Sequence, residues 1–230
     1  DNPRRQILEF VSHRKGQPGI IYCGTRAKTE TIANALKEAG HTSCYYHGGM
    51  PAEKRRLVES RFAVEDGLIV VATVAFGMGI DKPDIRWVAH ADLPKSIESF
   101  YQEIGRAGRD GGPAETYTLY GAEDIRLRRS QIDEGLASVK RKSADHGRLN
   151  ALLGLAEALK CRRTTLLEYF GENEVECGNC DLCEKPPDKF DATQAVRKAL
   201  SAILRTDEYY GAGHLIDILL GNETDRVLNN

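Results

Sequence analysis

The stretch Leu68–Pro83 reads LIVVATVAFGMGIDKP and joins an apolar run to a glycine-containing loop. The run Leu68–Ala72 is typical of a strand that is buried on both faces. In the loop, the glycines on either side of Met78 permit a tight turn with exposed backbone amides, and Asp81 and Lys82 add opposite charges at its end. Because such turns are also common in purely structural loops, the function of this one depends on what surrounds it.

Apolar runs of the same kind recur along the first half of the chain and alternate with amphipathic helices. We predict strands at residues 19–23, 44–46, 68–72, 87–90 and 116–120, and helices at 28–39, 51–62 and 96–109. This alternation predicts an α/β fold with a parallel sheet and crossover helices. The carboxyl ends of such strands share one edge, where ligands bind. Three polar segments follow strands and are expected at this edge: Gly24–Arg26, His47–Gly49 and Thr73–Lys82.

The motif Gln102–Asp110, QEIGRAGRD, is expected at the same edge. If the predicted helix continues through it, Gln102, Arg106 and Arg109 lie at i, i+4 and i+7, on one face. Planar, permanently charged guanidinium groups on a rigid face suit a phosphate group. The alternative is a solvated helix end at which both arginines face water. The opposite face is apolar and carries Ile97, Phe100, Tyr101 and Ile104.

The sequence offers these arginines no phosphate site within the same chain. It contains no G-x-x-x-x-G-K-[ST] loop and no aspartate-glutamate pair directly after a predicted strand. An arginine face that binds phosphate would therefore meet a phosphate that is held elsewhere.

Four cysteines in the C-terminal half predict a metal site. Cys177, Cys180 and Cys183 form consecutive C-x-x-C spacings, and Cys161 lies sixteen positions before the first of them. Four thiolates in tetrahedral reach suit a closed structural zinc site, which would stabilise a small helical subdomain rather than catalyse a reaction. Consecutive C-x-x-C spacings also occur in iron–sulfur proteins, so a cluster is the competing interpretation.

Composition bounds the remaining possibilities. The 230 residues suffice for one large domain or two small ones, and a net charge of −2 supplies no overall positive field for nucleic acid. With no run of about eighteen apolar residues and no signal-peptide core, we expect a soluble, intracellular chain. Cys23 and Cys44 lie in apolar runs and are expected to be core residues.

After Gly121 the chain becomes more basic. We predict helices at 122–132, 147–160, 191–204 and 213–220. A solvated helix pair and a nucleic-acid contact both account for the charge. The basic residues are Arg126, Arg128, Arg129, Lys140, Arg141, Lys142, Arg148, Lys160, Arg162 and Arg163.

Together, these motifs resemble the second half of a RecQ-type DNA helicase of superfamily 2. The resemblance rests on GIIYC at 19–23 with Arg26, YHGGM at 46–50, AFGMGIDKP at 75–83, QEIGRAGRD at 102–110, YFGE at 169–172 and the four cysteines. It implies that residues 1–121 form the second of two RecA-like lobes. A helical zinc-binding subdomain would follow at 122–190. Residues 191–230 would begin a winged helix, incomplete because the strands of the wing are lacking.

The resemblance also implies roles for individual residues. Arg106 and Arg109 would reach the γ-phosphate of ATP across a cleft to a first lobe that this chain does not contain, with Gln102 supporting them. Gly79 and Asp81 would lie near the nucleotide and its Mg²⁺. The path of a single DNA strand would be lined by Thr25, Arg26, His47, Gly48, Gly49 and Thr73. The metal at Cys161, Cys177, Cys180 and Cys183 would be zinc.

The implied function is that of an ATP-dependent 3′-to-5′ DNA helicase in DNA repair, recombination and the SOS response, with duplex DNA at the winged helix. The resemblance implies a monomer without membrane contact, in the bacterial cytoplasm and nucleoid or in a eukaryotic nucleus. Without the phosphate-loop lobe, the chain alone is not expected to hydrolyse ATP. The competing interpretation is a non-enzymatic, zinc-stabilised DNA-binding module whose Arg106 and Arg109 contact phosphates directly.

Overall fold

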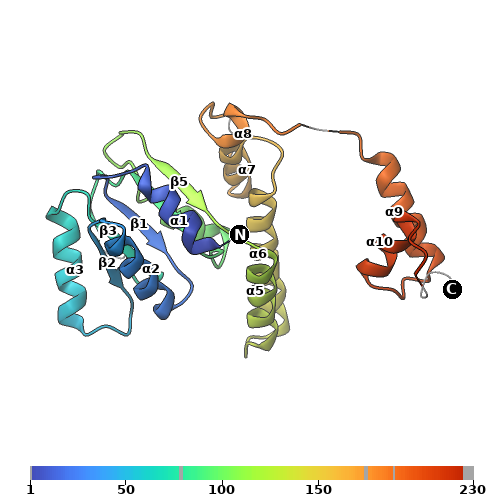
Figure 1. Cartoon of the computed structure of the whole chain (residues 1–230), viewed down its shortest axis with the longest axis horizontal. Coiled ribbons are helices and arrows are strands. Elements are labelled where there is room, and N and C mark those ends of the chain that lie inside the picture. The colour runs from blue at the N-terminus through green and yellow to red at the C-terminus, as the bar shows by residue number, and fades with distance from the viewer. Residues whose placement is uncertain (1, 78–79, 174–175, 189, 225–230) are drawn as a thin grey trace. The chain divides into compact units, whose positions relative to one another are not determined.

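The computed structural model describes residues 2–77, 80–173, 176–188 and 190–224 (Figure 1). The chain divides into two compact units, residues 1–177 and 178–230. The first contains α1 (Pro3–Ser12), β1 (Gly19–Tyr22), α2 (Arg26–Glu38), β2 (Ser43–Tyr46), α3 (Ala52–Val64), β3 (Ile69–Ala72), β4 (Trp87–His90), α4 (Ile97–Ile104), β5 (Glu115–Thr118), α5 (Ala122–Glu134), α6 (Val139–Ala156) and α7 (Arg162–Tyr169). The second contains α8 (Asp181–Glu184), α9 (Thr193–Arg205) and α10 (Ala212–Leu220). Within the described ranges, no helix is both long and apolar enough to cross a membrane.

The strands form one parallel sheet in the order β2-β3-β1-β4-β5. At its centre, Tyr22 of β1 lies beside Ala72 of β3 on one side and His90 of β4 on the other. These three strands are completely buried, as expected for apolar runs covered on both faces. The predicted α/β fold with a parallel sheet is therefore confirmed, and the carboxyl ends of its strands share one edge.

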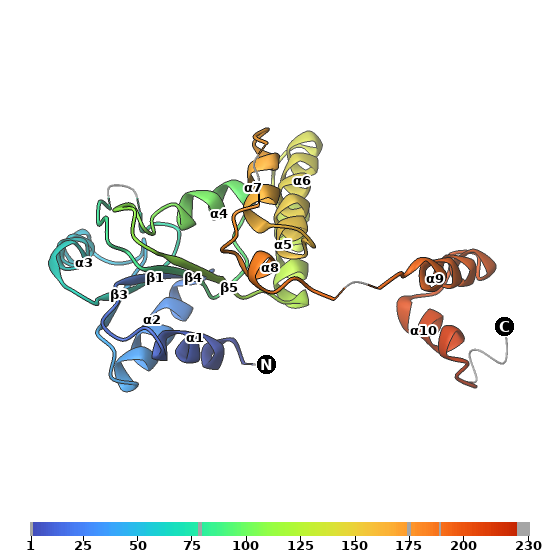
Figure 2. The ribbon, with the colours of Figure 1, turned by 90° about the horizontal axis from the view of Figure 1, so that it is seen from above.

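Helices cover both faces of this sheet (Figure 2). α1 and α2 pack on the face that carries Ile21 and Val71, and α3 packs through Phe62 on the face that carries Ile20 and Val70. Successive residues of a strand point to opposite faces, so one uninterrupted apolar run supplies both layers of the core.

α4 is shorter than the helix predicted at 96–109. The Ser96 hydroxyl caps its start by accepting the Ser99 N–H at 3.2 Å, but the helix ends at Ile104 and residues 105–110 form turns. Gly108 adopts a φ of +65° and donates its N–H to the Ile85 carbonyl at 2.9 Å, which takes the chain out of the helix. The prediction that Gln102, Arg106 and Arg109 share one helical face is wrong, because both arginines lie beyond the helix.

The apolar side of α4 packs on helices α5, α6 and α7, the helical region that follows the sheet. Ile97, Phe100 and Ile104 belong to a cluster with Leu149 of α6 and Leu166 of α7. α6 begins at Val139, earlier than predicted, and Arg162 Nη1 donates to the Leu155 and Ala156 carbonyls at its end, at 2.8 and 3.1 Å. The prediction is thereby confirmed for Ile97, Phe100 and Ile104, which attach the helical region to the sheet, but not for Tyr101, which is 44% exposed.

A substitution at Gly19 tests how tightly the centre of the sheet is packed. A Cβ added there would lie 2.1 Å from Cε2 of Trp87, which is fully buried. We therefore expect Gly19→Ala to lower the free energy of unfolding by about 1–3 kcal/mol through overpacking. Gly154→Ala is the matched control, because its Cβ meets no atom within 4 Å inside α6. It should raise stability by about 0.5–1 kcal/mol. Urea denaturation of both variants measures the difference, and equal stability would contradict the packing described here.

Candidate functional site

Residues 105–110, here called the arginine turn, contact the loop of residues 73–82 that follows β3, here called the glycine loop. Arg106 is half-buried, and its Nη1 donates to the Gly77 carbonyl at 2.5 Å. Gly77 has a φ of +144°, and a Cβ added there would lie 2.3 Å from Arg106 Nη2. Only glycine satisfies both constraints. The two motifs that the sequence predicts at one edge are therefore in direct contact.

Arg109 differs from Arg106 in its exposure. Its side chain is 43% exposed, and its Nε donates to the Gly105 carbonyl at 3.2 Å. Its Nη1 makes only longer contacts, 3.5 Å to the Ile80 carbonyl and 4.0 Å to a carboxylate oxygen of Asp81, which is itself almost fully exposed. The outer end of this guanidinium is therefore held only weakly. Gln102 is exposed on α4 and, among the described residues, makes no hydrogen bond to either arginine. Gly79, which the sequence places near the nucleotide, lies outside the described residues.

Tyr22 lies directly beneath this contact, at the end of β1. Its hydroxyl donates to the Phe76 carbonyl at 3.3 Å, next to Gly77. Burial raises the pKa of Tyr22 to about 12, while the charge of Arg106 lowers it and that of Glu103 raises it further. Tyr22 therefore stays a neutral donor at physiological pH and fixes the start of the glycine loop.

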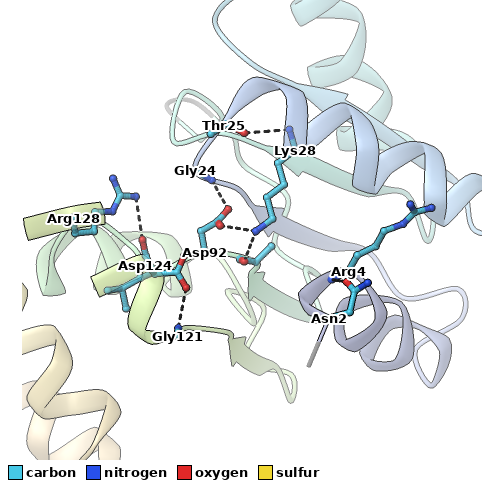
Figure 3. A network of polar contacts seen from close by, with 11 residues as sticks. Asn2, Arg4, Gly24, Thr25, Lys28, Asp92, Gly121, Asp124 and Arg128 are labelled. Atoms are coloured by element: carbon cyan, nitrogen blue, oxygen red, sulfur yellow. Dashed lines mark hydrogen bonds and ion pairs between the residues drawn. The ribbon is translucent and has the colours of Figure 1, made fainter. Parts of the chain in front are cut away.

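The loop after β1 is tied down by an acidic residue that the sequence analysis did not single out (Figure 3). Asp92 accepts the Gly24 N–H at 2.7 Å and the Lys28 ammonium at 2.5 Å. Thr25 caps α2 by accepting the Lys28 N–H at 3.3 Å. Arg128 of α5 donates to the Leu93 carbonyl at 3.1 Å, one residue after Asp92. This network joins the loop at Gly24 and Thr25, which is predicted to contact DNA, to α5 of the helical region.

In the loop after β2, the backbone of the two glycines is exposed to solvent, whereas the histidine side chain is not. His47 is buried and pairs through Nε2 with Glu30 at 3.0 Å, while Gly48 and Gly49 are exposed. A Cβ on Gly49 would come within 2.8 Å of the Arg26 guanidinium, so these two predicted DNA residues lie together. His47 was predicted to line the DNA path, but its side chain is buried and pairs with Glu30, an arrangement that supports the loop.

Thr73 links the loops after β2 and β3. Its N–H donates to the Tyr46 carbonyl at 3.1 Å, and it lines a pocket of about 100 Å³ at the edge of the sheet. His90, Asp92 and Glu103 line the same pocket. None of these three residues was predicted from the sequence. The available signal was that His90 and Asp92 are polar residues at and just after the end of an apolar strand, and that Glu103 directly precedes an apolar residue of α4.

The four cysteines predicted as metal ligands come together. Their sulfur atoms all lie within 4.8 Å of one another, and the Cys161–Cys177 and Cys180–Cys183 sulfur pairs are 3.5 Å apart. These separations are too long for disulfides. Four sulfurs about 2.3 Å from one zinc ion lie roughly 3.8 Å apart, so the arrangement fits tetrahedral zinc.

The two kinds of cysteine differ in ionisation. Burial would raise the pKa of Cys161, but hydrogen bonds from the Cys177 and Thr164 backbone amides, together with side-chain hydrogen bonds, lower it to about 5. Burial raises the pKa of Cys23 to about 12 and that of Cys44 to about 11. Cys161 is therefore suited to bind a metal as a thiolate, whereas Cys23 and Cys44 are core thiols, as predicted.

Comparison with known proteins finds three matched domains along the chain. Residues 3–111 match the helicase conserved C-terminal domain, residues 122–184 the RecQ zinc-binding domain and residues 186–230 the RQC domain. This chain belongs to the RecQ family. The RecQ zinc-binding match contains all four cysteines, so a structural zinc ion is supported over an iron–sulfur cluster.

Individual relatives carry the same assignment. The chain is 42% identical over 227 residues to the ATP-dependent DNA helicase RecQ of Haemophilus influenzae, covering 98% of this chain and 36% of that protein. It is 36% identical over 231 residues to the protein of the same name from Bacillus subtilis, covering 100% of this chain and 39% of that protein. The chain therefore spans just over a third of the length of these relatives.

Among solved structures, the Escherichia coli DEAD-box protein SrmB aligns with 26% identity and a TM-score of 0.49, covering 59% of this chain and 79% of that one. This similarity is too low to carry an argument, so the fold assignment rests on the strand order and the matched domains.

Zinc removal should destabilise the helical region selectively. We expect Cys180→Ser or chelation to abolish a stoichiometry of one zinc per chain and to lower the unfolding midpoint of residues after Gly121, because metal binding supplies folding free energy on the order of 10 kcal/mol. Cys44→Ala, a buried thiol outside the cluster, is the control and should keep its zinc. Elemental analysis and thermal unfolding followed by circular dichroism provide the measurement. A metal-free protein of equal stability, or a brown iron-containing one, would overturn the assignment.

Proposed function

We propose that this chain is the second motor lobe and zinc-binding subdomain of an ATP-dependent DNA helicase. The observation that carries the proposal is the contact between Arg106 and the Gly77 carbonyl, with Arg109 exposed beside Asp81. Phosphoryl transfer relies on positioned cations that stabilise charge on the γ-phosphate. A fixed arginine next to an accessible one, at the ligand-binding edge of a parallel sheet, supports that role.

In this proposal the two arginines act on ATP and Mg²⁺ that a first RecA-like lobe holds, and Gln102 assists them. Asp81 borders the nucleotide. The loop from Thr73 to Lys82 then connects the nucleotide to DNA, since it begins beside the Tyr46 carbonyl and ends at the arginine turn. ATP hydrolysis at the arginines would thereby move the loop that contacts the strand.

The DNA strand would cross the exposed backbone of Gly48 and Gly49, the Arg26 guanidinium and the loop at Thr25. Contacts of this kind recognise the phosphate backbone and not the sequence. Arg26 and the glycines lie together, which favours one continuous path.

The domain limits of the proposal are 1–121 for the motor lobe, 122–190 for the zinc-binding subdomain and 191–230 for the beginning of a winged helix that engages duplex DNA. The similarity to RecQ helicases favours 3′-to-5′ translocation by a monomer, in DNA repair, recombination and the SOS response. A bacterial protein of this kind acts in the cytoplasm and nucleoid, and a eukaryotic one in the nucleus.

The proposal predicts the behaviour of a chimeric helicase in which this chain replaces the matching 227 residues of the Haemophilus influenzae relative. Arg109→Ala should lower the DNA-stimulated kcat for ATP by about 10³–10⁵-fold, the range known for arginine fingers, and leave DNA affinity within about threefold. Arg4→Ala, an exposed arginine of α1 paired with Glu38, is the control and should leave both unchanged.

Two outcomes decide the interpretation. Loss of turnover with DNA binding retained supports the motor. Unchanged turnover with weakened DNA binding would instead identify a DNA-binding module in which the arginines contact phosphates directly. The separate 230-residue chain should show no ATPase activity in either case.

A further inference from the structure

A buried pair of polar residues lies behind the arginine turn. His90 ends β4 and Glu103 lies on α4, and their side chains are only 1% and 9% exposed. His90 Nε2 and the Glu103 carboxylate are 2.9 Å apart, and Thr118 Oγ1 lies 3.2 Å from His90 Nδ1. A neutral imidazole that accepts from Thr118 and donates to Glu103 satisfies every partner. The pair thus forms a hydrogen-bonded bridge from β5 through β4 to α4.

This bridge holds α4 at the place where regular structure stops. The α-helix ends at Ile104, and beyond it the Arg106 and Ala107 N–H groups donate to the Glu103 and Ile104 carbonyls, three residues back, at 3.4 and 3.1 Å. The position of Arg106 therefore follows that of the last turn of α4. Further contacts fix this turn on both sides. Before Arg106 it is fixed by Glu103, and after it by the hydrogen bond from Gly108 N–H to the Ile85 carbonyl at 2.9 Å.

The same bridge also supports the glycine loop, whose Gly77 carbonyl accepts the hydrogen bond from Arg106. The His90 and Tyr22 rings stack with centroids 5.5 Å apart, and the Tyr22 hydroxyl donates to Phe76, the residue before Gly77. His90 therefore touches groups that support both partners of the Arg106–Gly77 contact. A shift of the imidazole would move the donor and the acceptor separately.

We propose that His90 and Glu103 are positioning residues for ATP hydrolysis, which align the Arg106 guanidinium with the Gly77 carbonyl and so with the nucleotide. The inference rests on the proposed function. The pair acts through Arg106, because the bridge supports both this arginine and its acceptor, whereas Arg109 lies farther along the turn, is exposed and bonds to the Gly105 carbonyl instead. Misplacement of a catalytic group by about 1 Å costs on the order of a hundredfold in rate.

A double-mutant cycle in the chimeric helicase tests this inference. Glu103→Leu should lower kcat between about tenfold and a hundredfold with little change in the KM for ATP. Glu103→Gln should retain most of the activity, because its amide oxygen still accepts the His90 hydrogen bond. In an Arg106→Ala background, Glu103→Leu should cause no further loss, whereas in an Arg109→Ala background the full loss should remain.

Glu98→Leu is the matched control, since it removes another carboxylate of α4 that contacts Arg148 and Tyr169 instead. It should leave kcat unchanged. If Glu103→Leu does not fold, Thr118→Val removes only the hydrogen bond to His90 and should lower kcat in the same, Arg106-dependent way. An equal loss from Glu103→Leu with and without Arg106, or no loss at all, would overturn the inference. An inactive unsubstituted chimera would overturn the proposed function instead.

Discussion

The hydrogen bond between Arg106 and the Gly77 carbonyl is the contact on which the arrangement of this site depends. A half-buried guanidinium needs a fixed acceptor, and a backbone carbonyl supplies one without adding a second charge that would neutralise it. The acceptor must be exposed on a turn that only glycine adopts without a clash. That turn follows β3, an apolar strand that is completely buried. The burial of β3 fixes where the loop begins. Core packing therefore determines the position of a charge at the surface.

Contacts on two sides of α4 hold this helix in place, and α4 leads directly into the turn that carries Arg106. One side of the helix packs into the apolar cluster with α6 and α7, and the other carries Glu103 toward His90. Cys161 directly precedes α7, and Leu166 of α7 packs in the same cluster as Ile97 of α4. A metal bound at Cys161 would stabilise α7 and, through this cluster, α4, which leads into the arginine turn. In the proposed helicase, a zinc site that takes no part in chemistry would thus support the position of the arginines.

The parallel sheet, its strands and the cysteine cluster were predictable, because apolar runs and ligand spacing are local properties of the sequence. The end of α4 was not. Gly105 and Gly108 signalled a stop, but only the hydrogen bond from Gly108 to Ile85, a residue distant in sequence, determines the direction of the chain after Ile104. α1 went unpredicted because it carries few apolar residues, although Asn2 and Pro3 are typical of a helix start. His90, Asp92 and Glu103 were missed because their partners lie on other elements: polar residues next to apolar ones are visible in the sequence, but which of them pair is not.

The most direct test of this account is the arginine side-chain ¹⁵N–¹H spectrum of the zinc-loaded 230-residue chain, which needs neither ATP nor a first lobe. A guanidinium held on a carbonyl rotates slowly and gives separate Nη signals, whereas an exposed one averages. Arg106 should show resolved signals and Arg109 averaged ones, and Gly77→Ala should remove the Arg106 signals while the sheet remains folded. An averaged Arg106, or one that is indifferent to Gly77→Ala, would contradict the claim that the chain alone fixes this arginine.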